Sequence, residues 1–323
     1  MIQKLIEVSQ KPARIILGLM SGTSLDGLDL ALCWISGSGL NTRVELLKFE
    51  TMDYPEDFKE EVRSVFSKRS VDLEKVCLLN AYIGNLHGTY INECLKRWNI
   101  LNEDVDCIAS HGQTIYHAPQ RLHNQPQYPN ATLQIGDGDH LAVKTGILTL
   151  SDFRQKHLAG GGEGAPLALY GDYLMFTSPQ EDRILLNMGG ISNFTFLPKD
   201  GDTRRIISTD VGPGNTLIDA LSQKYFDVPF DKDSLVARRG TVNEALLEAM
   251  MAHPFFAEEL PKSTGPELFN LSFIESALEK LHLTNLAPED IVATVTILTA
   301  RTIADQLQKH YASIALSIYA SGG

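Results

Sequence analysis

The chain has 323 residues, of which 43% are hydrophobic and 21% are charged, and its formal net charge is −12. This length allows two domains with their own cores, and the acidic balance excludes nucleic acid as the main partner, since such proteins carry a basic patch. No apolar stretch approaches the ~18 residues of a transmembrane helix, so no membrane partner is expected. The four cysteines form no CxxC pair, which favours free thiols and a cytoplasmic location.

The first half of the chain predicts an α/β domain that opens with three antiparallel strands after a mobile leader at residues 1–12. Apolar and alternating runs predict strands at residues 14–19, 28–35, 43–50, 105–109 and 147–150. Helices are expected at residues 56–65, 73–98 and 140–145.

A long turn of small residues, GLMSGTSLDGLD at residues 18–29, joins the first two predicted strands. An ordinary hairpin turn needs only about two to five residues. Glycines let backbone N–H groups approach an anion closely, and hydroxyl groups add donors. The turn therefore predicts a site for the terminal phosphates of a nucleotide, with an ordinary polar turn as the alternative.

A similar hairpin, ILLNMGGISNFTF at residues 184–196, opens the second half of the chain. Its turn holds the paired glycines Gly189 and Gly190. Two such hairpins suggest an internal repeat, with domains at residues 1–175 and 176–323 that face a nucleotide from both sides. That architecture, two actin-like (ribonuclease H-like) domains with a nucleotide cleft between them, is typical of the actin-like ATPase and sugar-kinase superfamily.

The second half continues with elements of both kinds. Strands are expected at residues 205–209 and 314–319, and helices at residues 216–226, 243–251, 273–281 and 291–310. Between the first of these strands and the first helix lies Asp210-Val211-Gly212-Pro213-Gly214-Asn215, expected to be a loop. Ligands of α/β folds bind where strand ends face helix starts, and a helix N-terminus favours an ionised Asp210. That carboxylate could accept a proton from an attacking group, or it could simply satisfy the amides of the turn.

Other polar residues have two interpretations each. Asp152 and Arg154 could contact substrate hydroxyls or phosphate, or could form a salt bridge that supports the strand end. Gln113 could bind a sugar hydroxyl or belong to a structural turn. Lys262 could neutralise phosphate charge or lie in a solvated loop. The glycine cluster at residues 160–165 lacks the preceding strand and acid of a dinucleotide site, and no P-loop motif is present.

Taken together, these segments resemble anhydro-N-acetylmuramic acid kinases. The matching stretches, in the order of the family, are GLMSGTSLDGLD at 18–29, SHGQT at 110–114, QIGD at 134–137, DFR at 152–154, GAPL at 164–167, LNMGGISN at 186–193, DVGPGNTLIDA at 210–220 and PKSTG with FN at 261–270. The resemblance implies ATP and Mg²⁺ as cofactors. It also implies phosphorylation of 1,6-anhydro-N-acetylmuramic acid with hydrolytic opening of its anhydro ring, in peptidoglycan recycling, and it is compatible with a homodimer.

The resemblance assigns roles to individual residues. Asp210 is expected to be the catalytic base. The expected ATP contacts are Ser21, Gly22, Thr23, Ser24, Leu25, Asp26, Gly27, Leu28, Gly189 and Gly190. The expected sugar-substrate contacts are Gln113, Asp152, Arg154, Asn193, Gly212, Gly214, Asn215 and Lys262.

The sequence departs from the family pattern at several positions. Glu163 stands where the family usually has Gln, and His157 where it usually has Asp. Met20 stands where most of the superfamily has Asp, as is usual in this family, so metal contacts are expected from elsewhere, such as Asp26 or water. The chain ends at Ser321-Gly322-Gly323, where the family continues with an adenosine loop and closing helices, so a truncated second domain is expected. Two other functions stay open, namely another sugar or acyl-phosphate kinase and a nucleotide-binding relative without catalysis.

Overall fold

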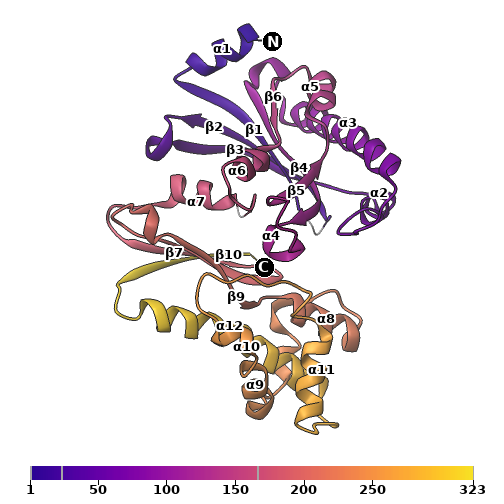
Figure 1. Ribbon diagram of the computed structural model, residues 1–323, viewed down its shortest axis with the longest axis vertical. Helices are drawn as coiled ribbons and strands as arrows, with labels where there is room; N and C mark the ends of the chain where they lie inside the picture. The colour runs from indigo at the N-terminus through magenta and orange to yellow at the C-terminus, as the bar shows by residue number, and fades with distance from the viewer. Residues whose placement is uncertain (1, 23–24, 166, 323) are drawn as a thin grey trace. The chain divides into compact units, whose positions relative to one another are not determined.

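The chain folds into two compact units, Met1–Ala168 (unit 1) and Leu169–Gly323 (unit 2), each with its own β-sheet (Figure 1). The computed structural model describes residues 2–22, 25–165 and 167–322. Helices accompany both sheets, which confirms the expected α/β class. Within these residues, no helix combines the length and the apolar character needed to cross a membrane.

The sheet of unit 1 has the strand order β3-β2-β1-β4-β5, and β6 pairs with β4. Its strands are β1 (Ala13–Ser21), β2 (Gly27–Ser36), β3 (Arg43–Asp53), β4 (Cys107–Ala118), β5 (Ala131–Ile135) and β6 (Thr149–Ser151). The first three strands are antiparallel, as predicted, whereas β4 runs parallel to β1 and β6 runs parallel to β4.

The longest helix of unit 1, α3 (Leu73–Trp98), covers one face of this sheet and has the bounds expected from the sequence. Its first turn is capped by the Asp72 side chain, which accepts a hydrogen bond from Glu74 N, and it ends at Asn99 in the left-handed conformation. The core between helix and sheet includes Ile83 and Leu30, which are fully buried. The other helices are α1 (Ile2–Gln10), α2 (Glu56–Arg63), α4 (Gln120–His123), α5 (Gly138–Thr145) and α6 (Phe153–Ala159).

The sheet of unit 2 has the order β10-β7-β8-β9. Its strands are β7 (Asp182–Met188), β8 (Ile191–Leu197), β9 (Ile207–Pro213) and β10 (Leu316–Gly322). Its helices are α7 (Ala168–Phe176), α8 (Thr216–Phe226), α9 (Glu244–Met251), α10 (Pro254–Ala257), α11 (Leu271–Lys280) and α12 (Pro288–Tyr311). One face of the sheet forms a core with α12, and a second core lies among α8, α9, α11 and α12.

Both units start with the same arrangement of strands. In unit 1, β1, β2 and β3 form an antiparallel meander, and β4 lies parallel to β1. In unit 2, β7, β8 and β9 form such a meander, and β10 lies parallel to β7. The two glycine-rich hairpins connect the equivalent strand pairs β1–β2 and β7–β8, which is the repeat that their sequences suggest.

Three expectations about individual elements were wrong. The leader forms helix α1, whose last carbonyl groups are satisfied by Arg14, with Nε 2.8 Å from Val8 O and Nη2 2.7 Å from Ser9 O. Strand β4 continues past residue 109 through the polar stretch SHGQT, because it pairs with β5 there. Strand β9 likewise continues to Pro213, so Asp210 lies inside a strand rather than in a loop.

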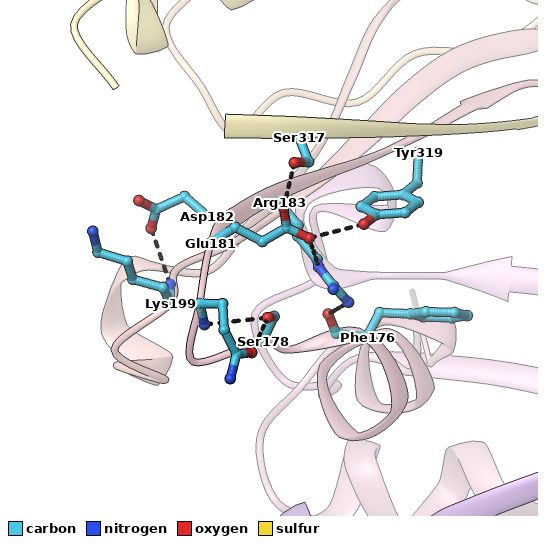
Figure 2. A network of polar contacts seen from close by, with 9 residues as sticks. Phe176, Ser178, Glu181, Asp182, Arg183, Lys199, Ser317 and Tyr319 are labelled. Carbon is cyan, nitrogen blue, oxygen red and sulfur yellow. Dashed lines mark hydrogen bonds and ion pairs between the residues drawn. The ribbon is translucent and has the colours of Figure 1, made fainter. Parts of the chain in front are cut away.

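Strand β10 is tied to β7 by polar contacts around Glu181 (Figure 2). The Glu181 carboxylate accepts hydrogen bonds from Ser317 Oγ, from Tyr319 Oη at 2.8 Å and from Arg183 Nε at 2.9 Å. Arg183 also donates to the Phe176 carbonyl at 2.8 Å. These donors, Ser317 first, lower the pKa of the Glu181 carboxyl, so they hold it in its charged form.

Glu181→Gln should lower the Tm by a few degrees at pH 7 and by much less below about pH 4. A carboxyl whose pKa is lowered by folding stabilises the fold above its unfolded pKa, and this contribution is lost as the pH falls. Thermal unfolding of wild type and variant at both pH values measures the difference. The control is Glu279→Gln, an exposed position in the same unit, and an equal difference at both pH values would contradict the interpretation.

Candidate functional site

The first glycine-rich hairpin, between β1 and β2, is fixed by the core of unit 1. Leu25 and Leu28 are 2% and 0% exposed, so their side chains belong to the core and only their backbone could reach a phosphate. Asp26 is exposed, and its carboxylate accepts a hydrogen bond from Gly27 N at 3.2 Å. Two further expected phosphate contacts lie outside the described residues, namely Thr23 and Ser24.

Glycine is required at position 27 by the packing of the sheet. A Cβ atom at this position would lie 2.8 Å from the Met52 carbonyl oxygen on β3. The close approach of β2 to β3 therefore requires glycine here, whether or not a phosphate binds.

Ser21 and Gln113 are brought together by the parallel pairing of β1 and β4. The Ser21 hydroxyl donates to Gln113 Oε1. Gln113 Nε2 donates to the carbonyl oxygens of Gly22 at 3.3 Å and of Thr114 at 3.1 Å. Because Gln113 is 0% exposed, its amide holds the hairpin here and does not face a sugar hydroxyl.

Arg154 and Asp152 lie after β6, where the sequence placed them, but they form no salt bridge with each other. Arg154 Nε donates to His111 Nε2 at 3.0 Å, so the His111 proton lies on Nδ1, 2.8 Å from Gly112 O. Burial, and to a lesser extent the Arg154 charge, lower the pKa of His111. Asp152 is exposed in the left-handed conformation with φ 62°, and its side chain does not cap α6.

The second hairpin, between β7 and β8, turns at Gly189 and Gly190 and is anchored to the start of α8. The N–H groups of Gly214 and Asn215 donate to the carbonyl oxygens of Gly190 and Gly189, both at 2.9 Å. Thr216 N donates to Gly190 O at 3.1 Å. These amides would otherwise be free at a helix N-terminus. Gly214 and Asn215, which were expected to contact the substrate, therefore use their N–H groups to hold the hairpin.

Gly214 is required by this close packing. A Cβ atom on Gly214 would lie 2.1 Å from the Gly189 carbonyl oxygen, a distance that no side chain could adopt without moving the hairpin. Gly212 lies in β9 beside α12, where a Cβ atom would lie 2.9 Å from Thr302 Oγ1.

A row of polar residues crosses the sheet of unit 2. Asn193 pairs with Asp210 on β9 and with Asn187 on β7, and Asn187 pairs with Ser321 on β10. Directly paired residues share one face of a sheet, and the opposite face packs in the core. Asn187 was not among the residues expected from the sequence. In the observed register Met188 lies opposite Ser192, so three residues, 189–191, separate the paired strands and Asn187 lies opposite Asn193.

Asp210 is held in place at one carboxylate oxygen. Its Oδ2 accepts hydrogen bonds from Thr264 N at 2.8 Å and from Ser263 Oγ at 3.2 Å. Among the described residues, no donor reaches its Oδ1. Burial raises the pKa of Asp210, while the two donors favour its charged form. The carboxylate is therefore oriented, more basic than an exposed aspartate and able to take a proton at Oδ1. The N–H groups at the start of α8 were expected to keep Asp210 ionised, but they bind the carbonyl oxygens of the second hairpin instead.

The backbone of Lys262 joins the loop that binds Asp210 to strand β9. Its carbonyl oxygen accepts a hydrogen bond from Asp210 N at 3.0 Å, and its N–H donates to Thr209 Oγ1 at 3.0 Å. Its ammonium group is buried, 2.8 Å from the Phe255 carbonyl oxygen and 4.4 Å from the centre of the Phe255 ring. In this arrangement the Lys262 ammonium group stabilises the loop that binds Asp210 through its contacts with Phe255.

The two departures from the family pattern have partners inside unit 1. Glu163 forms an ion pair with Arg121, with 3.2 Å between Oε1 and Nε. His157 Nδ1 accepts a hydrogen bond from Gly164 N at 3.2 Å. Both contacts hold the glycine cluster that precedes α7.

Comparisons with known proteins place the chain among its relatives. A putative N-acetylmannosamine kinase from Listeria monocytogenes and a ROK family glucokinase from Streptomyces griseus are 12% identical and have TM-scores of 0.31 and 0.32. Each comparison covers 96% of this chain and 83% of the solved one. Such values are too low to support an argument.

The similarity in sequence is much stronger. The anhydro-N-acetylmuramic acid kinase of Pseudoalteromonas atlantica is 55% identical over 100% of this chain and 81% of its own length. The enzyme of that name from Caldanaerobacter subterraneus is 39% identical over 95% of this chain and 78% of its own length. The model of the anhydro-N-acetylmuramic acid kinase family matches residues 14–323. This chain therefore belongs to the anhydro-N-acetylmuramic acid kinase family, a family of ATP-using phosphotransferases.

Proposed function

We propose that this chain converts 1,6-anhydro-N-acetylmuramic acid, ATP and water into N-acetylmuramic acid 6-phosphate and ADP, as a cytoplasmic step of peptidoglycan recycling. The observation that carries the proposal is Asp210, which is oriented through Oδ2, has no donor to Oδ1 among the described residues, and pairs with Asn193 on the strand that follows the Gly189–Gly190 turn. Membership of the family supplies the substrate class. We further propose that each unit contributes its glycine-rich hairpin to binding of the nucleotide phosphates.

Asp210 acts as the general base in this reaction. Its carboxylate takes a proton from water, and the water oxygen attacks the anomeric carbon of the sugar. The bond between that carbon and the bridge oxygen breaks, and the bridge oxygen bonds to the γ-phosphorus of ATP as ADP leaves. A pKa raised by burial brings the base closer to the working pH, which favours proton transfer.

The hairpins position the phosphates for this transfer. Phosphoryl transfer asks little covalent work of a protein and depends on positioning and on stabilising charge. The contacts proposed are the backbone of residues 21–28 in unit 1 and of Gly189 and Gly190 in unit 2. Asn193, in the row with Asp210, and the exposed Asp152 remain the best placed of the proposed sugar contacts.

Mg²⁺ is proposed as a companion of ATP rather than a resident of the protein. Within the described residues, no group of three or more His, Cys, Asp or Glu side chains could hold a metal ion. Magnesium in kinases usually keeps several waters and binds through one or two carboxylates and the substrate phosphates. When bound, the ion would neutralise charge on those phosphates. On the first hairpin, the exposed carboxylate of Asp26 is the proposed protein ligand of the ion.

The product of a reaction with Mg-ATP and 1,6-anhydro-N-acetylmuramic acid should be heavier than the sugar by one phosphoryl group and one water. Mass spectrometry of the reaction mixture measures this directly. Addition of a phosphoryl group alone would indicate a simple sugar kinase. Binding of ATP with no product from this sugar or from a panel of other sugars and carboxylates would indicate a relative without catalysis.

Asp210→Asn should lower kcat by about 10²- to 10⁴-fold, because it removes the base, while the affinity for ATP stays unchanged. The Asn oxygen can still accept the hydrogen bonds from Ser263 and Thr264, so the fold should persist. Steady-state kinetics and calorimetric titration with ATP test both parts. The control, Asp227→Asn, changes an exposed carboxylate of the same unit at a left-handed position that Asn tolerates. Near-normal turnover in Asp210→Asn would refute the assigned role.

A further inference from the structure

We propose that Tyr54 and His87 are positioning residues for the first phosphate hairpin, acting through a buried chain of hydrogen bonds that ends at Ser21 and Gln113. The inference rests on the proposed function, since it assumes that this hairpin binds the phosphates of ATP. Neither residue was singled out by sequence analysis, because each lies far along the chain from the hairpin that it supports.

The chain of hydrogen bonds is continuous. Tyr54 Oη lies 2.8 Å from His87 Nε2 and 2.9 Å from Ser21 Oγ, and Ser21 Oγ in turn contacts Gln113 Oε1. The four side chains come from α3, from the residue after β3, from β1 and from β4. Their exposed fractions are 1%, 3%, 2% and 0% in the order His87, Tyr54, Ser21, Gln113. The four side chains are therefore shielded from bulk solvent.

Each residue in this chain of hydrogen bonds donates to the next residue in the direction of the hairpin. Burial lowers the pKa of His87 to about 3, so its ring is neutral. Tyr54 uses its only proton on Ser21, so His87 Nε2 must carry the proton of the ring and donate to Tyr54. The Ser21 proton is then directed at Gln113 Oε1, and Gln113 Nε2 donates onward to the Gly22 carbonyl oxygen at 3.3 Å.

One observation argues against a purely structural role. His87 Nδ1 is buried and has no hydrogen-bond partner within the described part of the chain. An unsatisfied buried nitrogen destabilises the fold, and an apolar side chain of similar size would avoid this cost. The contact of Nε2 with Tyr54 is what the imidazole supplies and an apolar residue could not.

The consequence for the hairpin is electrostatic. The Gly22 carbonyl oxygen accepts hydrogen bonds from Gln113 Nε2 and, at 3.4 Å, from Leu25 N. These contacts keep that oxygen, which carries a partial negative charge, from turning toward a bound phosphate. The orientation of the Gln113 side-chain amide depends on its contact with Ser21, and the orientation of the Ser21 hydroxyl depends on Tyr54. Loss of the Tyr54 hydroxyl should therefore weaken ATP binding without touching the sugar site or Asp210.

Tyr54→Phe should raise the dissociation constant and the KM for Mg-ATP about 5-fold, the effect of one net hydrogen bond, and should leave the KM for the sugar unchanged. The ring of Phe keeps the contact with Phe58, whose centroid lies 4.3 Å away, so the fold is preserved. The measurements are calorimetric titration with Mg-ATP, steady-state kinetics for both substrates and the Tm.

The matched control is Tyr90→Phe. Tyr90 stacks on Tyr54 with ring centroids 6.2 Å apart, and its hydroxyl donates to the Asp53 carbonyl oxygen at 3.2 Å. This variant loses one hydroxyl from the same aromatic cluster outside the chain of hydrogen bonds, so its affinity for Mg-ATP should equal that of the wild type.

An unchanged dissociation constant for Mg-ATP in Tyr54→Phe would overturn the inference, and so would an equal rise in the KM for ATP and sugar. Calorimetric titration separates this failure from a failure of the proposed function, because it needs no turnover. A wild type that binds ATP but forms no product refutes the function and still allows the positioning role to be measured. A wild type that binds no ATP refutes both.

Discussion

Buried polar groups must find hydrogen-bond partners, and this requirement fixes both of the hairpins on which the proposed nucleotide site depends. In unit 1, Ser21 and Gln113 satisfy each other and hold the carbonyl of Gly22. In unit 2, the carbonyl oxygens of Gly189 and Gly190 are bound by amides at the start of α8. Each hairpin is thus held by hydrogen bonds from within its own unit.

A parallel strand lies beside each hairpin, and in unit 1 that strand supplies the support. In unit 1, β4 runs parallel to β1 and carries Gln113 to the level of Ser21. In unit 2, β10 runs parallel to β7, and its residue Ser321 pairs with Asn187 next to the turn. The same topology therefore serves the two hairpins, although the groups that hold them differ. Glu181 reinforces the arrangement in unit 2 by binding β10 at its other end.

The placement of Asp210, the proposed base, follows from the same constraint. Asp210 lies in β9, paired with Asn193, and the loop after α10 supplies both donors to its carboxylate. The buried backbone of Lys262 ties this loop to β9. The position of the Asp210 carboxylate is therefore set by the strand, and its orientation by the loop.

The sequence predicts the elements of this fold better than the partners of its polar side chains. Residues 73–98 and 216–226 form the helices expected, because apolar spacing and end signals are local. The hydrogen bond between Ser21 and Gln113 joins residues 92 positions apart, and nothing local to either residue indicates it. Lys262 is a second case in which local sequence does not indicate the partner of a side chain. Its motif predicts a cation near phosphate, whereas its ammonium group is buried against the carbonyl oxygen of Phe255.

The most direct test of the account is amide hydrogen exchange with and without Mg-ATP. If both hairpins bind the nucleotide phosphates, peptides covering residues 18–29 and 184–196 should both become protected, whereas the glycine cluster at residues 160–165 should not change. Protection of only one hairpin, or of the glycine cluster instead, would contradict the claim that two equivalent hairpins form the nucleotide site.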